Sequence, residues 1–378
     1  MLPRLHVALV YNMKKENADE VSNHPRSEET EESGVAVASR TKLQETRHDT
    51  YAEWDSEATI LAVKAALAER HSVTMIEATD HAPHQLLEVQ PDIVFNIAEG
   101  LRGPSREAQI PAVLEMLGIP YTGSDPVTLG ISLDKARAKE ILSFYKIPTP
   151  DFHIISSLEE LHRRVVAFPS VVKPLHEGSS KGVLNSSIVR TQAELAEQVQ
   201  RVLDDYDEPA LVEKFVPGRE FTVALLGNGP TLRVFPIVEI RLDRLPPGAN
   251  PLYSYEAKWV WDQIDHPVEM YDCPAGIDHD LERRIKETCL NAFRVLRCRD
   301  WCRIDLRLDE SGIPNVIELN PLPGILPNPD DHSSFPMAAR AAGLSYSAML
   351  NAVLDEAILR YGMHNGKSGN AKSSGRVH

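Results

Sequence analysis

Cysteines are scarce in this sequence, and its N-terminal stretch has no long apolar run. Of 378 residues only four are cysteines, Cys273, Cys289, Cys298 and Cys302, too few for a disulfide framework. Cys298 and Cys302 lack partners at zinc-ligand spacing, so buried thiols are favoured over a structural metal. The apolar run at residues 5–11 is too short for a signal sequence or a membrane span. We therefore expect a cytoplasmic protein.

Positive charge is also in short supply. The chain has 40 Lys and Arg against 55 Asp and Glu, a formal net charge of −15. Such a surface repels phosphate and anionic lipid, so we expect neither a nucleic-acid nor a membrane partner, although local basic pockets are compatible with it. Composition is that of a globular protein, with 42% hydrophobic and 25% charged residues, and the length allows two or three domains.

The N-terminal third alternates predicted strands and helices. Strands are expected at residues 6–10, 73–77 and 93–96, and a helix is expected to start at Ser56. This order predicts an α/β unit with a parallel sheet, whose ligands lie beyond the carboxyl ends of the strands. Residues 16–50 are polar and nearly free of large apolar side chains, so we expect a disordered insertion there.

Three folded units and a tail are predicted. The N-terminal α/β domain spans residues 1–124, a central unit 125–213 and a C-terminal unit 214–361. Residues 362–378 are mostly Gly, Ser, Asn and Lys and are expected to be disordered. Within the central unit, a helix is expected at residues 158–165.

Residues 303–324 carry the strongest chemical pattern. Two alternating strands flank Asp-Glu-Ser-Gly, which is typical of a hairpin. Side chains two apart share a face, so Arg303 lies beside Asp305 and Glu318 beside Asn320, and the turn brings Asp305 roughly opposite Glu318. Two carboxylates and an amide oxygen suit Mg²⁺, which also binds the phosphate oxygens of a nucleotide.

A hairpin whose polar face is simply solvated is the alternative. Against it stands the opposite face, which is apolar and is expected to be buried and to fix the register. Its residues are Ile304, Leu306, Leu308, Ile317 and Leu319. The Pro-Leu-Pro-Gly turn at 321–324 then offers backbone N–H groups that could face an oxyanion.

Two further segments are suited to a nucleotide. A predicted strand ends at Lys173, and a Gly-Ser loop follows that can present backbone N–H groups to phosphate. It is not a Walker-type loop, because Gly-x-x-x-x-Gly-Lys-Ser/Thr is absent. A short apolar segment between Glu213 and Glu220 could contact adenine and ribose, with an edge strand flanked by charges as the alternative. Lys135 begins a helix, where a solvated surface lysine is the alternative.

In this order, the segments resemble the signature of ATP-grasp enzymes, and among these the D-alanine:D-alanine ligases. The resemblance covers residues 90–360 and rests on Lys135, the 173–183 loop, Glu213-Lys214 with Glu220, Glu256-Ala-Lys258, Arg303-x-Asp305, Glu318-x-Asn320 and residues 332–343. It implies an α/β, three-domain ATP-grasp fold, with an N-terminal parallel α/β domain and two α+β domains clasping ATP and two Mg²⁺ or Mn²⁺ ions. It also implies a homodimer.

The resemblance implies a role for each matching residue. The residues implied to bind the nucleotide phosphates are Lys135, Lys173, Ser180 and Lys258. Those implied to hold adenine and ribose are Glu213, Lys214, Val216 and Glu220. The implied metal ligands are Asp305, Glu318 and Asn320. Arg303 and the Gly324 N–H would stabilise a tetrahedral oxyanion, Ser179 would sit beside the acyl donor, and Ser333 would meet the carboxylate of the second substrate.

The N-terminal substrate segments depart from the family pattern. These ligases usually carry Gly-Gly-x-Ser-x-Glu after the first strand, and its glutamate meets the ammonium of the first amino acid. Here Glu53 or Asp55 could replace that glutamate. Asn96 and Glu99 stand where the family has a His-Gly segment, and Trp259 replaces a lid tyrosine.

The implied reaction joins a small-molecule carboxylate to an amine. The γ-phosphoryl group of ATP moves to the carboxylate, the amine attacks the acyl phosphate, and ADP and phosphate are released with an amide. No covalent enzyme intermediate is needed, which fits the absence of a nucleophile with an adjacent base. One alternative is the same chemistry on a different donor in natural-product biosynthesis. The other is an ATP sensor, which Arg303 disfavours because binding alone needs no oxyanion-stabilising arginine.

Overall fold

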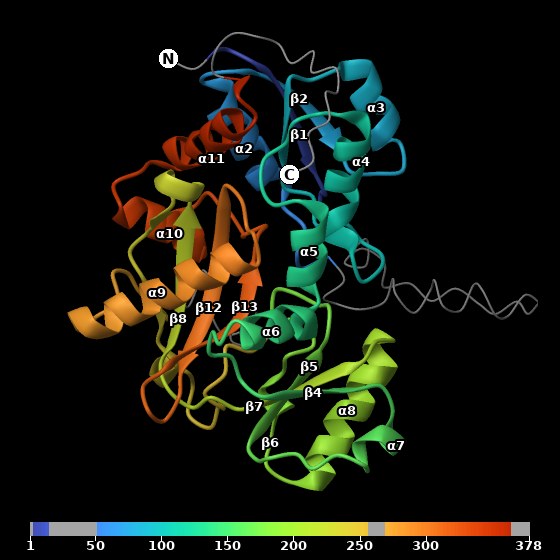
Figure 1. The fold of residues 1–378 in the computed structure, drawn as a ribbon, viewed down its shortest axis with the longest axis vertical. Helices are drawn as coiled ribbons and strands as arrows, with labels where there is room; N and C mark the ends of the chain where they lie inside the picture. The colour runs from blue at the N-terminus through green and yellow to red at the C-terminus, as the bar shows by residue number, and fades with distance from the viewer. Residues whose placement is uncertain (1–2, 15–50, 256–268, 364–378) are drawn as a thin grey trace, which may run out of the picture.

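The computed structural model describes residues 3–14, 51–255 and 269–363 (Figure 1). The expected insertion at 16–50, the segment with Glu256, Lys258 and Trp259, and nearly all of the expected tail lie outside the described residues. Within the described part, no helix is both long and apolar enough to cross a membrane. All four cysteines are free thiols, and three of them are buried, as expected from their spacing.

The N-terminal unit is a parallel sheet with helices packed against it, as predicted. Strands β1 (His6–Tyr11), β2 (Ser72–Glu77) and β3 (Ile93–Asn96) pair in the order β2-β1-β3. The helices of this unit are α2 (Glu57–Ala68), α3 (Ala82–Val89) and α4 (Gln109–Leu117). Ser56 caps α2 by accepting a hydrogen bond from the N–H of Thr59, which explains why the helix starts there.

The central unit is a four-stranded antiparallel sheet covered on one side by helices α7 (Leu158–Leu161) and α8 (Gln192–Tyr206) (Figure 1). Its strands are β4 (Phe152–Ile155), β5 (Ser170–Pro174), β6 (Ile188–Val189) and β7 (Ala210–Lys214), in the order β4-β7-β5-β6. The predicted helix at 158–165 is too long, because α7 ends before the two β-branched residues Val165 and Val166. Val166 instead packs against the core of this unit.

Two helices lie in the chain between the N-terminal sheet and the central sheet. They are α5 (Pro126–Leu133) and α6 (Lys135–Phe144). The side chain of Asp134 caps α6 by accepting from the N–H groups of Ala136 and Arg137. Lys135 therefore begins the helix, as the sequence predicts.

The C-terminal unit has the third sheet of the described residues, in the order β11-β10-β8-β12-β13, with β9 paired to β8. Its strands are β8 (Glu220–Leu226), β9 (Arg233–Val234), β10 (Val238–Ile240), β11 (Tyr271–Asp272), β12 (Trp301–Leu308) and β13 (Pro314–Asn320). Its helices are α9 (His279–Val295), α10 (Ser334–Ala341) and α11 (Tyr346–Arg360). The described residues also form short 3-10 helices. Two lie before the C-terminal unit, η2 (Arg106–Ala108) and η3 (Asn185–Ser187), and three lie within it, η4 (Gly229–Thr231), η5 (Leu242–Arg244) and η7 (Pro329–Asp331).

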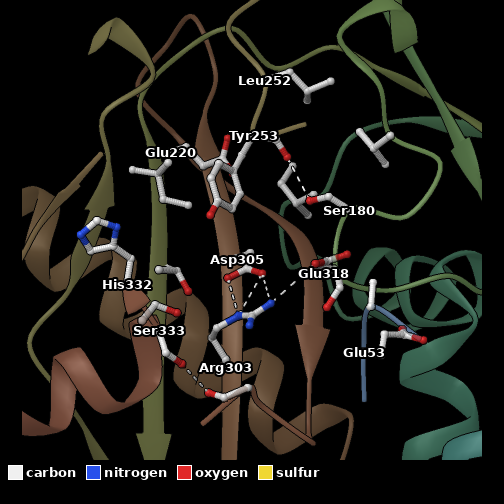
Figure 2. Close-up of a pocket in the computed structure, with 18 of the residues that line it drawn as sticks. Glu53, Ser180, Glu220, Leu252, Tyr253, Arg303, Asp305, Glu318, His332 and Ser333 are labelled. Carbon is white, nitrogen blue, oxygen red and sulfur yellow. Dashed lines mark hydrogen bonds and ion pairs between the residues drawn. The ribbon is translucent and has the colours of Figure 1, made fainter. Parts of the chain in front are cut away.

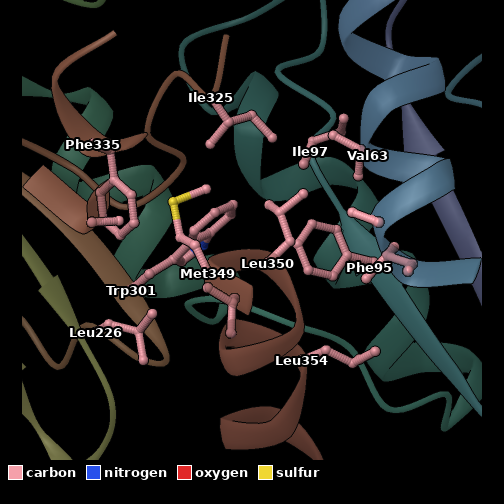
Figure 3. Close-up of a cluster of buried hydrophobic side chains, with 14 of the residues drawn as sticks. Val63, Phe95, Ile97, Leu226, Trp301, Ile325, Phe335, Met349, Leu350 and Leu354 are labelled. Atoms are coloured by element: carbon pink, nitrogen blue, oxygen red, sulfur yellow. The ribbon is translucent and has the colours of Figure 1, made fainter. Parts of the chain in front are cut away.

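One hydrophobic cluster joins the first and last parts of the chain (Figure 3). Phe95 of β3 packs edge-on against Trp301 of β12, with ring centroids 5.8 Å apart. Trp301 in turn packs against Phe335 of α10 at 5.6 Å. Leu350 and Leu354 of α11 belong to the same cluster. This shared core fixes the N-terminal sheet relative to the β12–β13 hairpin.

Candidate active site

The β12–β13 hairpin has the predicted register. Asp305 pairs with Glu318, and Arg303 pairs with Asn320. The register shifts after Asp305, where a bulge leaves Ile317 without a cross-strand partner. The prediction that Ile317 lies on the buried apolar face is therefore wrong, because the bulge turns it into the wall of a cavity.

That cavity has a volume of about 1010 Å³ and collects most of the predicted site residues. They come from all three parts of the chain: Glu53, Asp55, Lys135, Lys173, Ser179, Ser180, Glu213, Lys214, Val216, Glu220, Arg303, Asp305, Glu318, Gly324 and Ser333. Three other predicted site residues, Asn96, Glu99 and Asn320, are among the described residues but do not line this cavity. Lys258 lies outside the described residues.

Arg303 and the two hairpin carboxylates form the centre of the cavity (Figure 2). Nη2 of Arg303 donates to Oδ2 of Asp305 at 2.9 Å and lies 3.9 Å from Glu318. Burial raises the pKa of Asp305, Arg303 lowers it and Glu318 raises it, which leaves it above its ordinary value. Nδ2 of Asn320 donates to Oδ2 of Asp305 at 3.2 Å.

This donor set fits a hard divalent cation that also binds phosphate. Asp305 and Glu318 offer two adjacent carboxylates with more negative charge than Arg303 balances. No cluster of three or more His, Cys, Asp or Glu ligands occurs among the described residues. Mg²⁺ characteristically takes one or two carboxylates and completes its shell with water and substrate phosphates, so a two-carboxylate site matches a metal–nucleotide complex.

Lys135 and Lys173 are buried beside these carboxylates, with exposed fractions of 7% and 5%. A solvated surface position for Lys135 is therefore ruled out. Burial raises the pKa of Glu318, but Lys135, Lys173 and Arg303 outweigh burial and hold it below its ordinary value. The two lysines give the cavity a positively charged wall that suits a polyphosphate.

The side chain of Glu213 orients Lys173. Its carboxylate lies 2.5 Å from Nζ of Lys173 and 3.0 Å from Nζ of Lys139. Burial raises the pKa of Glu213, but the two lysines overcome this and lower it to about 2. Lys139 was not singled out from the sequence, although it lies four residues after Lys135, on the same side of α6.

Glu220 is paired with Arg307, a second residue that the sequence analysis missed. The two side chains are 3.2 Å apart, and Arg307 also stacks on the ring of Phe215 at 4.9 Å. Burial raises the pKa of Glu220 to about 7 against the lowering effect of Arg307. The alternation Arg303, Asp305, Arg307 along β12 places all three on one side of the strand, which is the signal that could have identified Arg307.

Among the remaining predicted residues, Ser333, Gly324, Glu53 and Asp55 line the cavity, whereas Asn96 and Glu99 do not. At one end, Oγ of Ser333 donates to the carbonyl of Gly324 at 3.0 Å (Figure 2). At the other end, Glu53 and Asp55 line the wall. Asn96 is buried, with its Nδ2 unpaired among the described residues. Burial and the nearby Glu107 raise the pKa of Glu99 well above its ordinary value.

Comparison with known proteins decides the family. A family model described as the C-terminus of D-ala D-ala ligase matches residues 141–355, more than half of the chain. A D-alanine–D-alanine ligase of Bordetella avium is 38% identical over 254 residues, which cover 66% of this chain and 74% of that protein. The chain belongs to the D-alanine–D-alanine ligase family. An uncharacterised protein of Sinorhizobium fredii, y4sG, is 38% identical over 313 residues, or 79% of this chain and 87% of that protein.

Solved structures agree on the fold. A D-alanine–D-alanine ligase of Bacillus anthracis complexed with ATP superposes with a TM-score of 0.64 at 23% identity, covering 94% of this chain and 98% of that one. The VanG D-Ala:D-Ser ligase of Enterococcus faecalis gives 0.63 at 20% identity, over 94% and 99% of the two chains. The predicted ATP-grasp fold is therefore confirmed.

Membership in the D-alanine–D-alanine ligase family makes this chain an ATP-dependent ligase that forms a carbon–nitrogen bond. The family uses ATP, a divalent metal and small-molecule substrates. The motif-based resemblance and the ligase prediction are confirmed, and neither the sensor nor the natural-product donor is favoured. Residue roles rest on the geometry described above.

Proposed function

We propose that this ligase joins D-alanine, through its carboxylate, to the amino group of a second D-alanine-like substrate, releasing ADP and phosphate. The observation that carries the proposal is the gathering of Lys135, Lys173, Arg303, Asp305 and Glu318 around one cavity of about 1010 Å³. Phosphoryl transfer needs cations that position and neutralise phosphate, and amide formation needs a donor aimed at the oxyanion. The side chains gathered in the cavity are of the types that both steps need.

The nucleotide is assigned to the part of the cavity between the central and C-terminal sheets. Lys135, Lys173 and Ser180 would contact the phosphates, with Lys173 held in place by Glu213. Lys214 and Val216 would contact adenine, and Glu220 would accept a hydrogen bond from a ribose hydroxyl. Burial raises the pKa of Glu220 to about 7 despite Arg307, so the Glu220 carboxyl is only partly ionised near neutral pH. A ribose hydroxyl would add a second hydrogen-bond donor beside Arg307.

Asp305, Glu318 and Asn320 would hold two Mg²⁺ or Mn²⁺ ions, which supply charge neutralisation during phosphoryl transfer. Arg303 is fixed by its paired hydrogen bonds to Asp305, at 3.1 and 2.9 Å. It would stabilise the oxyanion that forms when the amine attacks the acyl phosphate. The C–N bond then forms, the C–O bond to phosphate breaks, and phosphate leaves with the bonding electrons. Ser333 would bind the carboxylate of the second substrate, and the Gly324 N–H would join Arg303 at the oxyanion.

At the donor end, Asp55 is the better candidate for the ammonium of the first substrate. The carboxylate of Glu53 already accepts hydrogen bonds from Arg106, Lys181 and the N–H of Gly178. No cation is paired with Asp55 among the described residues, and burial raises its pKa to about 7. A substrate ammonium would supply the counter-charge that Asp55 lacks.

Several finer features are also part of this proposal. They are the homodimer, the cytoplasmic location, the division of the chain after residues 124 and 213, Ser179 beside the acyl donor, and Asn96 and Glu99 behind the donor end. Burial of Glu99, which raises its pKa well above the ordinary value, supports its place behind the donor end.

The experiment is a phosphate-release assay on the purified full chain with ATP and Mg²⁺. Amino acids are added singly and in pairs, and products are identified by mass spectrometry. We expect release that depends on D-alanine and a dipeptide product. Nucleotide binding without release for any amino acid or pair would contradict the proposal.

A further inference from the structure

Two buried cations connect the N-terminal unit to the Gly-Ser loop. Arg106 belongs to η2 and is 6% exposed, and Lys181 lies in the loop and is 7% exposed. Nη2 of Arg106 donates to both carboxylate oxygens of Glu53, at 3.0 and 2.9 Å. Nζ of Lys181 lies 3.2 Å from Oε2 of Glu53. One carboxylate of the N-terminal unit is thus shared between a cation of its own unit and a cation of the loop.

Glu177 is the second carboxylate that lies within ion-pair distance of both cations. It lies 3.3 Å from Arg106 and 2.5 Å from Lys181. Nη1 of Arg106 also donates to the carbonyl of His176 at 2.9 Å, just before the loop. Two positive charges therefore face two negative charges in a site largely shielded from water, where removing one member leaves the others uncompensated.

The contact is closest at Gly178. Its N–H donates to Oε1 of Glu53 at 2.9 Å, and a Cβ at this position would stand only 2.3 Å from that oxygen. The next residues, Ser179 and Ser180, have φ angles of 50° and 61°. Residues other than glycine adopt this left-handed conformation only when surrounding contacts hold them in it. The ion pairs at Glu53 and Glu177 are contacts of this kind.

We propose that Arg106 and Lys181, acting through Glu53 and Glu177, form a clamp that positions the Gly-Ser loop for the phosphates of ATP. The inference rests on the proposed assignment of residues 173–183 as the phosphate-binding loop. Neither Arg106 nor Lys181 lines the cavity in the described part of the chain, so both are positioning residues. Glu53 and Glu177 do line it. The clamp therefore ties the N-terminal donor end of the cavity to the loop at its nucleotide end.

The test measures the affinity of the full chain for a Mg²⁺-bound, non-hydrolysable ATP analogue, with no other substrate present. Arg106→Met and Lys181→Met should each weaken binding by about tenfold or more, because each leaves a buried carboxylate uncompensated. Arg106→Lys should recover part of the affinity, since an ammonium keeps the charge but loses the paired hydrogen bonds.

Arg70→Met is the control for losing an ion pair outside the cavity. It removes another bidentate ion pair, in which Arg70 donates to both oxygens of Asp355 at 2.8 Å, on residues that do not line the cavity in the described part of the chain. Analogue affinity should not change in this variant. The Arg70 and Asp355 side chains are 38% and 29% exposed, so this control reports the loss of a less buried ion pair. Urea unfolding of each variant therefore accompanies the affinity measurement, and a variant that stays folded yet binds the analogue more weakly has lost the clamp rather than its overall stability.

Hydrogen exchange of residues 177–183 provides a second readout. Exchange in this segment should be faster in Arg106→Met and Lys181→Met, and unchanged in Arg70→Met. If Arg106→Met does not fold, Lys181→Met decides the question, because it leaves the N-terminal unit intact. Wild-type affinity together with wild-type exchange in Lys181→Met would overturn the clamp. Failure of the proposed function would look different: the wild type would bind the analogue but release no phosphate.

Discussion

Replacing Asp55 by Asn should impair recognition of the donor while sparing ATP. Asp55 lines the donor end of the cavity, and among the described residues no cation neutralises it. Asn has nearly the same shape but cannot provide a negative charge for a substrate ammonium. The change therefore isolates the charge of Asp55 from its packing.

The size of the effect follows from the partial burial of the site. Breaking a fully buried ion pair costs about 3–5 kcal/mol, and we take about 2–3 kcal/mol here because Asp55 keeps some exposure to the cavity. At about 1.36 kcal/mol per factor of ten, the KM for D-alanine should rise about 30- to 160-fold. The KM for ATP should change by less than about twofold, because the nucleotide end is untouched.

The pH dependence gives a second signature. Burial raises the pKa of Asp55 to about 7, so below this pH the side chain is mostly protonated and offers no charge to an ammonium. The donor KM should fall about tenfold from pH 6 to pH 8 in the wild type, and Asp55→Asn should abolish this change.

Other ionisable groups near the donor end bear on that profile. The pKa of Glu53 is held at about 2 by Lys181 and Arg106 despite burial, and burial raises the pKa of Tyr346, so neither titrates between pH 6 and 8. Glu99 has its pKa raised well above the ordinary range by burial and by Glu107. Burial also raises the pKa of Glu107 to about 7. Glu99→Gln and Glu107→Gln should therefore both keep the wild-type profile, and its loss in Asp55→Asn alone would assign the titration to Asp55.

The assay is phosphate release at saturating ATP with D-alanine varied. Glu53→Gln serves as the comparison, because Glu53 is already paired and should affect ATP more than the donor. An unchanged donor KM in Asp55→Asn would refute the assignment. A donor-selective defect in Glu53→Gln would transfer the role to Glu53. Normal donor use by both variants would point to a donor without an α-amino group.

The hairpin could be predicted in detail because local rules determine it. Alternation on both strands and a tight turn fix which side chains face each other, and Asp305 does pair with Glu318. The bulge at Ile317 was missed, although the adjacent apolar residues Val316 and Ile317 interrupt the alternation of β13 there. No glycine accompanies this interruption, so the sequence does not distinguish a bulge from a strand with one extra apolar side chain.

Charge partners distant in the sequence could not be predicted. The sequence shows that Arg106 and Lys181 are basic, but not that both meet Glu53, which is 53 and 128 residues away from them. For the same reason the sequence could not choose between Glu53 and Asp55, which are two residues apart and chemically alike. Only their partners in the folded chain distinguish a carboxylate that is already paired from one that is not.

Three further predictions test the hairpin, the lysine pair and the shared core. Glu318→Gln should reduce turnover by about 10³-fold or more while analogue binding stays measurable, because it removes a metal ligand; near-normal turnover would refute that role. Lys139→Met should raise the KM for ATP about tenfold with a smaller effect on kcat. Without Lys139, the carboxylate of Glu213 would interact with Lys173 alone and draw it away from the phosphates. An unchanged KM would show that Lys139 contributes only to packing. Trp301→Ala should lower the free energy of unfolding by about 3–5 kcal/mol in urea titrations, with Trp301→Phe costing less, because Trp301 is fully buried between Phe95 and Phe335. Since these rings come from both ends of the chain, the N-terminal sheet and the hairpin should lose structure in one transition. Separate transitions in the Trp301→Phe protein would show that the core in Figure 3 does not couple them.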